Sequence, residues 1–262
     1  MPSRFPVRPV SPRPGSRPGS RKERRLWEDG YRLVAGVDEV GRGAWAGPLS
    51  VGVVVVSEPL ARMPRGLRDS KQVSETDREQ LFDKVAAWSR AWAVGHSEPE
   101  ECDRLGMTSA LVLATRRAFS QLPDEHLPHA VVLDGKFDFV SRAFEESPET
   151  LLPTGFGPAV HTVVKADASC VSVAAASVLA KVTRDRLMRA TAQSYPPFDF
   201  ERNKGYPSPA HQRALRGYGL SAIHRRSWVF VEKLPWADPY WSGLGDALFE
   251  EPEVTASPKA DE

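Results

Sequence analysis

Three short apolar runs, each ending in an aspartate, limit what this chain can fold into. They cover residues 32–38, 130–134 and 161–167, and they end at Asp38, Asp134 and Asp167. Their continuous, β-branched character predicts buried strands. In an α/β sheet, functional groups gather beyond the carboxyl ends of the strands. We therefore expect the three aspartates to lie together at one edge of a sheet.

Further periodic segments complete an α/β fold with a mixed sheet flanked by helices. Residues 49–56 and 91–96 are expected to form two more strands, and the first of these pairs with 32–38. Helices are predicted at 74–88, where Ser74 and Asp77 resemble a capping pair, at 108–122 and at 169–193. Ser208 and Pro209 have the residue types of an N-cap and first turn, and Gly217 is expected to end that helix.

Composition divides the chain into four parts. Residues 1–25 are rich in Pro, Ser, Gly and Arg and are expected to form a disordered basic tail. Residues 26–200 carry the α/β domain, and 201–245 form a small helical C-terminal region. Residues 246–262 are polar and are expected to be disordered. Within the α/β domain, 137–158 is interpreted as an inserted surface loop.

The bulk properties exclude several classes of protein. The formal net charge is only +1, so a nucleic-acid partner requires basic residues that gather locally. The longest apolar runs are too short to cross a bilayer, and the N-terminus lacks a secretory apolar region. Cys102 and Cys170 are far apart and lack zinc-site spacing, which favours a reducing, cytoplasmic location. Nothing indicates an obligate oligomer, so we expect a monomer.

The carboxylates themselves predict a metal site. Glu39 stands beside Asp38, so four carboxylates converge if the three strands are neighbours. Such a cluster is costly without a counter-charge, and oxygen ligands without His or Cys favour Mg²⁺ or Mn²⁺ over zinc. Two such ions can stabilise both the attacking and the leaving oxygen in phosphodiester cleavage. The alternative is that each aspartate forms a turn or caps a helix, as Asp167 could.

Several motifs in one order resemble those of type 2 ribonuclease H, the ribonuclease HII family. The sequence DEVGRG at 38–43 follows LVAGV at 33–37, and DSK at 69–71 precedes SE at 74–75. LDG at 133–135 and VKAD at 164–167 resemble the segments of the third and fourth carboxylates, and AASVLAKVTRD at 175–185 resembles the family's long helix. KGYP at 204–207, His211 and HRRS at 224–227 match its C-terminal motifs. Ala166 departs from the family's usual glycine, and 137–158 is longer than usual.

The resemblance implies a ribonuclease H-like fold and hydrolysis of RNA in RNA–DNA hybrids. It also implies incision at single ribonucleotides embedded in duplex DNA, which leaves 5′-phosphate and 3′-hydroxyl ends and belongs to replication and ribonucleotide excision repair. By the motif matches, Asp38, Glu39, Asp134 and Asp167 hold the Mg²⁺ or Mn²⁺ ions. Metal activates the water nucleophile, so no side-chain nucleophile is required.

Substrate contacts follow from the same motifs. The turn of Gly41, Arg42 and Gly43 is expected to contact the 2′-hydroxyl with its backbone and a phosphate with Arg42. Tyr206 is expected to stack on the deoxyribose beside the ribonucleotide. Phosphate or other substrate contacts are assigned to Lys71, Ser177, Lys204 and Arg226, with Lys181 and Arg225 adding to a local basic surface. The alternatives are a tight glycine turn, a tyrosine that anchors its turn, and solvated charges.

Three rival functions remain at this stage. Type 3 ribonuclease H shares much of the pattern but carries a folded N-terminal domain, which the tail here cannot form. A hybrid-binding module without catalysis would not need all four carboxylates. A two-metal nuclease that acts on DNA alone would not need the GRG turn or the KGY motif. The sequence does not identify a replication clamp or polymerase partner. His161, His211 and His224 are expected to be structural.

Overall fold

A five-stranded mixed sheet forms the centre of the molecule. The computed structural model describes residues 17–68, 73–145, 153 and 155–234. The strand order is β3-β2-β1-β4-β5, with β2 antiparallel to β1 and β3, and β4 parallel to β1 and β5. The predicted mixed sheet is confirmed. The strands are β1 (Leu33–Val40), β2 (Leu49–Ser57), β3 (Ala91–Ser97), β4 (Ala130–Asp134) and β5 (Ala159–Val163).

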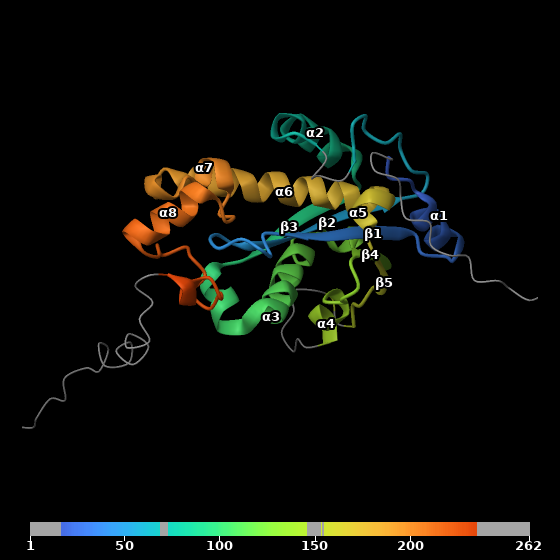
Figure 1. Cartoon of the computed structure of the whole chain (residues 1–262). Helices are drawn as coiled ribbons and strands as arrows, with labels where there is room; N and C mark the ends of the chain where they lie inside the picture. Colours follow the sequence, from blue (N-terminus) through green and yellow to red (C-terminus); the bar gives the residue numbers. More distant parts are fainter. Residues whose placement is uncertain (1–16, 69–72, 146–152, 154, 235–262) are drawn as a thin grey trace, which may run out of the picture.

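Helices cover both faces of this sheet. In Figure 1, α6 and α2 lie on one face and α3 and α4 on the other, while α7 and α8 extend beyond the end of the sheet. The helices are α1 (Arg21–Glu28), α2 (Glu75–Trp88), α3 (Pro99–Phe119), α4 (Val140–Glu145), α5 (Ala166–Ser169), α6 (Val171–Ala192), α7 (Phe200–Asn203) and α8 (Pro209–Tyr218), with single 3₁₀ turns at Asp124–His126, Pro196–Phe198 and Val231–Lys233. None of the described helices is long and apolar enough to cross a membrane.

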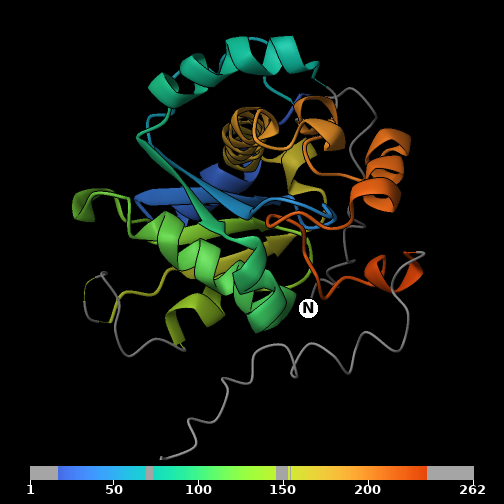
Figure 2. The ribbon, with the colours of Figure 1, turned by 90° about the vertical axis from the view of Figure 1, so that its left-hand side faces the viewer.

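Helix α6 lies unusually close to the sheet because glycines face it. A Cβ atom on Gly36 of β1 would come within 2.1 Å of the Ser172 carbonyl carbon, and one on Gly52 of β2 within 2.7 Å of the Ala176 oxygen. The helix contributes mostly alanine and valine to this contact. Figure 2 shows α6 end-on, between the sheet and α2. This close approach brings the side chains of α6 to the edge where the carboxylates lie.

The N-terminal boundary predicted from composition is wrong. Residues 21–25 begin α1, and Gly19 pairs with Cys170. The Glu23 side chain is fully buried, and its Oε1 accepts hydrogen bonds from the Ser172 backbone N (3.0 Å) and hydroxyl (2.7 Å). Glu23 therefore satisfies donors at the start of α6. The rest of the predicted tail, 1–16, and the predicted tail at 246–262 lie outside the described residues.

Two helix boundaries also differ from the prediction. Helix α3 begins at Pro99, nine residues before the predicted 108, because Glu98 and Glu101 form a capping box there. The chain bends at Gly106, which has φ 76°. Helix α8 begins at Pro209 with Ser208 as its cap, as predicted, but it ends at Tyr218 rather than at Gly217.

The segment interpreted as an inserted surface loop is partly core. Its residues Val140 and Ala143, in α4, are fully buried. The rings of Phe144 and Phe156 pack against Phe119 of α3, at centroid distances of 5.1 Å and 6.2 Å. An amphipathic turn in this segment therefore closes the lower face of the sheet; residues 146–152 and 154 are outside the described part.

The C-terminal helices form a third apolar cluster beside the α/β domain. Phe198, Phe200 and Leu215 pack there with Ala46, which follows β1, and Met188, near the end of α6. The cluster thus fixes the turn between α7 and α8 against the glycine-rich turn that connects β1 to β2. These two turns carry the predicted substrate-binding residues.

Candidate active site

Asp38, Glu39 and Asp134 stand on adjacent parallel strands. Val37 of β1 pairs with Leu133 of β4, so the residues that follow each lie at the same edge of the sheet. Asp167 does not end a strand, contrary to the prediction. Strand β5 stops at Val163, and Asp167 lies in the short helix α5, after Lys165 in the left-handed conformation (φ 57°). Asp167 still acts electrostatically on Asp38.

Burial and like charge set the electrostatics of these carboxylates. Burial raises the pKa of Asp38 to about 8, and the negative charges of its three acidic neighbours also raise it. Burial likewise raises the pKa of Glu39; the nearby Arg42 guanidinium lowers it and Asp134 raises it. The carboxylates are thus close enough to repel one another, and a cation placed among them would relieve that repulsion.

Local hydrogen bonds hold the individual carboxylates in place. The Ser177 hydroxyl on α6 hydrogen-bonds Asp38, and this bond lowers the Asp38 pKa. The Ala166 backbone N donates to Asp134 Oδ1 at 2.6 Å. Arg42 Nη1 lies 3.6 Å from Glu39 Oε1. Ser177 is thus buried and contacts Asp38, and its predicted contact with phosphate stays a prediction.

The glycine-rich turn and the KGY turn meet beside the carboxylates. The Gly41 N–H donates to the Tyr206 hydroxyl at 3.1 Å, although the residues are 165 positions apart. Gly41 has φ +86°, and a Cβ there would come within 2.3 Å of Arg184 Nε. Gly43 is different: it is exposed, its φ is outside the left-handed region, and a Cβ would meet nothing within 4 Å. Packing therefore requires glycine at 41 and not at 43.

Two buried arginines that the sequence did not single out as site residues hold these turns together. Arg184 on α6 is fully buried and donates to the carbonyls of Pro48 (2.8 Å), Lys204 (2.9 Å) and Ala46 (3.1 Å). Arg225, expected on a basic surface, is also fully buried and donates to Arg42 O and Gly47 O. A signal for Arg184 was present, because it stands four residues from both Ala180 and Met188 on the inward side of α6.

The sequence of this chain matches a known protein family. A family model described as Ribonuclease HII matches residues 35–231. Ribonuclease HII of Streptomyces avermitilis is 45% identical over 206 residues, which cover 79% of this chain and 81% of that protein. The chain belongs to the ribonuclease HII family. It is therefore a metal-dependent endoribonuclease of a family that cleaves RNA in RNA–DNA hybrids, and the expected type is confirmed.

Solved structures agree with the assignment to ribonuclease HII. The ribonuclease H2 of Pyrococcus horikoshii superposes with a TM-score of 0.63 at 33% identity, over 77% of this chain and 96% of that chain. The ribonuclease HII of Archaeoglobus fulgidus, solved in complex with PCNA, gives a TM-score of 0.60 at 27% identity over the same shares. The expected ribonuclease H-like fold is confirmed.

The ribonuclease HII carboxylates fit a hard divalent cation. The donors are all carboxylate oxygens. Asp38 and Asp167 are buried, and the negative charges of three neighbouring acids act on Asp38. In the described part of the chain, no three His, Cys, Asp or Glu side chains are arranged to enclose an ion by themselves. Mg²⁺ sites commonly combine a few protein carboxylates with water and substrate phosphates.

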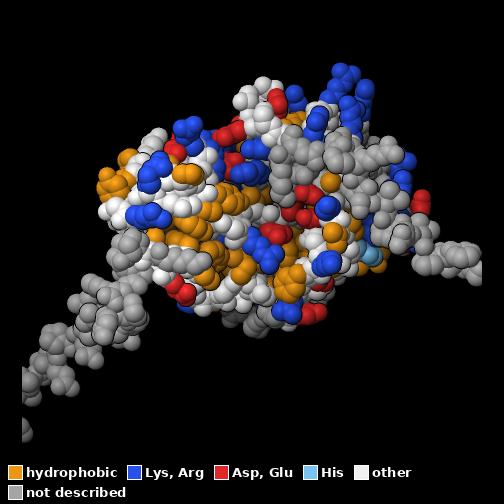
Figure 3. All heavy atoms as spheres, viewed as in Figure 1, with side chains coloured by type: hydrophobic (Ala, Val, Ile, Leu, Met, Phe, Trp, Pro, Cys, Tyr) orange, Lys and Arg blue, Asp and Glu red, His pale blue; other side chains and the backbone are white. Residues whose placement is uncertain are grey.

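The other residues predicted to contact substrate differ in their surroundings, and their contacts stay predictions. Lys204 is buried and left-handed (φ 53°), and its ammonium pairs with Glu75 at 3.1 Å. Arg226 is exposed, but its backbone N donates to Asp103. Lys71 lies outside the described residues. Figure 3 shows basic and acidic side chains interspersed over one face of the molecule, with no continuous basic surface there.

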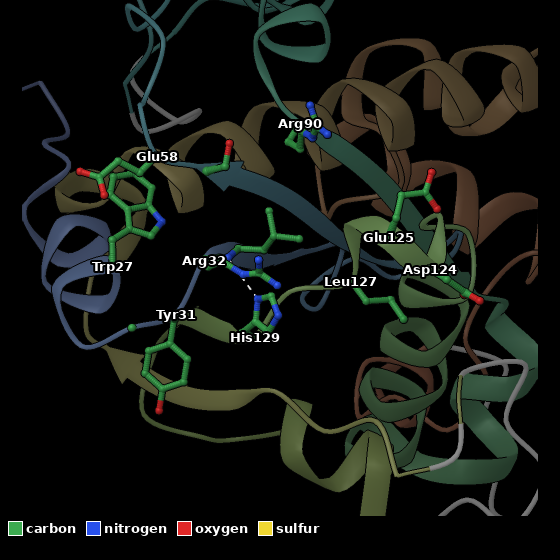
Figure 4. Close-up of a pocket in the computed structure, with 12 residues that line it drawn as sticks. Trp27, Tyr31, Arg32, Glu58, Arg90, Asp124, Glu125, Leu127 and His129 are labelled. Carbon is green, nitrogen blue, oxygen red and sulfur yellow. Dashed lines mark hydrogen bonds between the residues drawn. The ribbon is translucent and has the colours of Figure 1, made fainter.

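A wide pocket elsewhere in the molecule is not part of this site. It is lined by residues at the start of β1, such as Arg32 and Leu33, together with Ser57 at the end of β2 and His129 just before β4. Figure 4 shows Arg32 and His129 at its floor, with Trp27 and Tyr31 at one side. The carboxylates lie toward the other end of β1, so the pocket and the active site are at opposite ends of the sheet.

Proposed function

We propose that this chain hydrolyses the RNA strand of RNA–DNA hybrids and incises 5′ to single ribonucleotides embedded in duplex DNA. The products carry 5′-phosphate and 3′-hydroxyl ends. The observation that carries the finer proposal is the hydrogen bond between Gly41 N and the Tyr206 hydroxyl. It joins a backbone turn suited to a 2′-hydroxyl with an aromatic ring suited to the neighbouring deoxyribose.

Asp38, Glu39, Asp134 and Asp167 are the proposed metal ligands. Two Mg²⁺ or Mn²⁺ ions bound there would neutralise phosphate charge and lower the pKa of a bound water. The protein's own part is to orient the oxygens. Ser177 fixes the Asp38 carboxylate from α6, and the Ala166 backbone fixes Asp134 from α5. Since the four acids come from three elements, β1, β4 and α5, the rigid sheet sets most of their spacing.

Recognition of ribose is assigned to the backbone around Gly43. A 2′-hydroxyl is both a donor and an acceptor, and it distinguishes RNA from DNA. Gly43 leaves open space where any other residue would place a Cβ. Arg42, whose side chain is 59% exposed, is long enough to reach a phosphate beside that sugar.

Recognition of the following deoxyribose is assigned to the Tyr206 ring. The guanidinium carbon of Arg184 lies 5.3 Å from the ring centroid, and the Lys181 ammonium lies 5.6 Å from it. These cations and the Gly41 hydrogen bond fix the ring plane. A fixed ring accepts a sugar without a 2′-hydroxyl and gives a preference for an RNA–DNA junction.

The test is a cleavage assay on a labelled DNA duplex that holds one ribonucleotide, beside a continuous RNA–DNA hybrid and an all-DNA duplex. Each substrate is incubated with Mg²⁺, Mn²⁺ or EDTA. We expect metal-dependent incision 5′ to the ribonucleotide, cleavage of the hybrid and an intact DNA control. Cleavage of the hybrid alone would refute the junction proposal. Binding of all hybrids without any cleavage would leave a binding module.

A further inference from the structure

Two buried histidines contact each other directly beside the KGY turn. His211 on α8 and His224, in the turn that follows α8, have 0% and 1% of their surfaces exposed. Their Nε2 atoms are 2.8 Å apart. The rings of Phe198 and Phe200 pack against both. Each buried imidazole has two polar nitrogens, and both nitrogens need hydrogen-bond partners inside this aromatic cluster.

The hydrogen bonds around the pair fix the position of every proton. The Ser221 backbone N–H can only donate, and it lies 2.9 Å from His224 Nδ1, so that nitrogen is an acceptor. The proton of His224 is therefore on Nε2 and is donated to His211 Nε2. The proton of His211 is then on Nδ1, which lies 2.9 Å from the Tyr206 carbonyl oxygen and donates to it.

Both rings must be neutral for this chain of bonds to exist, because a second proton on either ring would place two donors face to face. Burial lowers the pKa of His224 to about 3, and the neighbouring His211 lowers it further; burial also lowers the pKa of His211. The bonds consequently run in one direction only, from the 221–224 turn through the two rings to the backbone of Tyr206.

Tyr206 is thereby held at both ends. Its carbonyl accepts from His211, while its hydroxyl accepts from Gly41. The residue before it, Gly205, has φ +83°, and its carbonyl accepts from the backbone of Trp45 at 2.8 Å. The Trp45 ring in turn lies 5.8 Å from the His211 ring. The imidazole pair thus connects α8 to the backbone of Tyr206.

We propose that the His211–His224 pair positions Tyr206 against Gly41 and so sets the preference for a ribonucleotide followed by a deoxyribonucleotide. This inference rests on the proposed function of Tyr206. The two imidazoles are positioning residues: they act through the Tyr206 backbone and do not touch the sugar. A small displacement of the Tyr206 ring weakens its contact with the deoxyribose at the junction. Binding of a long hybrid depends on many other contacts and is weakened far less.

Two substitutions of the same residue separate positioning from packing. His211→Asn removes the imidazole but places an amide N–H near the former Nδ1, where it donates to the Tyr206 carbonyl. His211→Gln removes the same ring but reaches toward His224 and leaves the Tyr206 carbonyl without its donor. Both variants lose the aromatic packing, so His211→Asn is the matched control.

The measurement is the ratio of kcat/KM on the single-ribonucleotide duplex to kcat/KM on the continuous hybrid, with thermal unfolding recorded beside it. We expect His211→Gln to lower this ratio about tenfold, the effect of losing one hydrogen bond, and His211→Asn to keep it within about threefold of the wild-type value. An equal ratio in both variants, with a similar loss of thermal stability, would show that the pair only fills the core and would overturn the inference.

The same assay distinguishes this inference from the proposed function. If the wild-type chain cuts the hybrid but not the single-ribonucleotide duplex, the proposed junction activity fails and the inference falls with it. If it cuts both and the ratio ignores the substitutions, only the inference fails. Should His211→Gln not fold, ¹⁵N NMR of the wild-type imidazoles decides: a proton on Nε2 of His211 would leave Tyr206 without a donor and overturn the proposal.

Discussion

Gly41→Ala should mainly lower stability and Gly43→Ala should mainly lower cleavage, although the two glycines lie in one turn. At Gly41, the left-handed φ costs an alanine about 1–2 kcal/mol. The new Cβ also lies 2.3 Å from Arg184 Nε and 2.7 Å from Pro48 O. It must displace a guanidinium that donates to three carbonyls, and loss of one such bond costs about 1.5–3 kcal/mol.

The expected loss for Gly41→Ala is therefore about 3–5 kcal/mol, or a fall in Tm of roughly 6–20 °C for a domain of this size. At Gly43, where a Cβ meets nothing, the stability should stay within about 0.5 kcal/mol of wild type. Its methyl group would instead keep the ribose away from the backbone, and cleavage at a single ribonucleotide should fall on the order of a hundredfold.

Thermal unfolding by circular dichroism and the single-ribonucleotide cleavage assay test both halves of this reasoning. Each variant serves as the control for the other, because the same chemical change is made two residues apart. A Gly41→Ala protein that melts within about 2 °C of wild type would show that the turn absorbs the overlap. A Gly43→Ala protein with normal cleavage would show that the open space at Gly43 is not where the sugar lies.

Three further changes test the site and its supports. Asp38→Asn should abolish cleavage and raise Tm in EDTA, because it removes a carboxyl whose ionised form is disfavoured by burial and by three neighbouring acids; loss of folding would make Asp38 structural. The pKa of Glu23 is raised in the folded chain above its ordinary 4.5, so the stability of the fold should fall as pH rises from 4.5 through the raised pKa. Glu23→Gln lacks this titration, so a urea midpoint with the same pH dependence in both proteins would contradict the prediction. Arg184→Lys should cost about 2–4 kcal/mol, because one ammonium cannot serve three separate carbonyls, and an unchanged urea midpoint would exclude that role.

The sheet and its neighbouring acids followed from short-range patterns. A buried strand shows in a window of a few residues, so β1, β2, β3 and β4 were located within one or two positions. Asp167 was assigned to the site from an expected strand end and from its motif's resemblance to that of a family, and the expected strand end was wrong. Its local context predicted a strand up to Asp167, but β5 ends four residues earlier, at Val163, and the left-handed Lys165 turns the chain into α5.

Contacts between distant segments were beyond such windows. Glu23 lies among prolines and arginines that favour disorder, and only its partner Ser172, 149 positions later, makes that stretch part of the fold. Arg225 looked like one more surface cation beside Arg226. Its burial depends on the carbonyls of the glycine-rich turn, which accept from it 178 and 183 positions away. No local pattern specifies which of two adjacent arginines points inward.

Helix α6 contacts the N-terminal segment, the carboxylates and the turns around Tyr206. Its first turn is capped by Glu23, its middle supplies the Ser177 hydroxyl to Asp38, and its later turns supply Arg184 to the turns around Tyr206. The helix is rigid, and the missing side chains of Gly36 and Gly52 hold it against β1 and β2. A shift along its axis would therefore move the edge proposed to bind metal and the turns proposed to bind sugar together. In the proposed function, one helix on one sheet would set the distance between phosphate cleavage and sugar recognition, and a site assembled from segments far apart in the chain would keep a fixed register on its substrate.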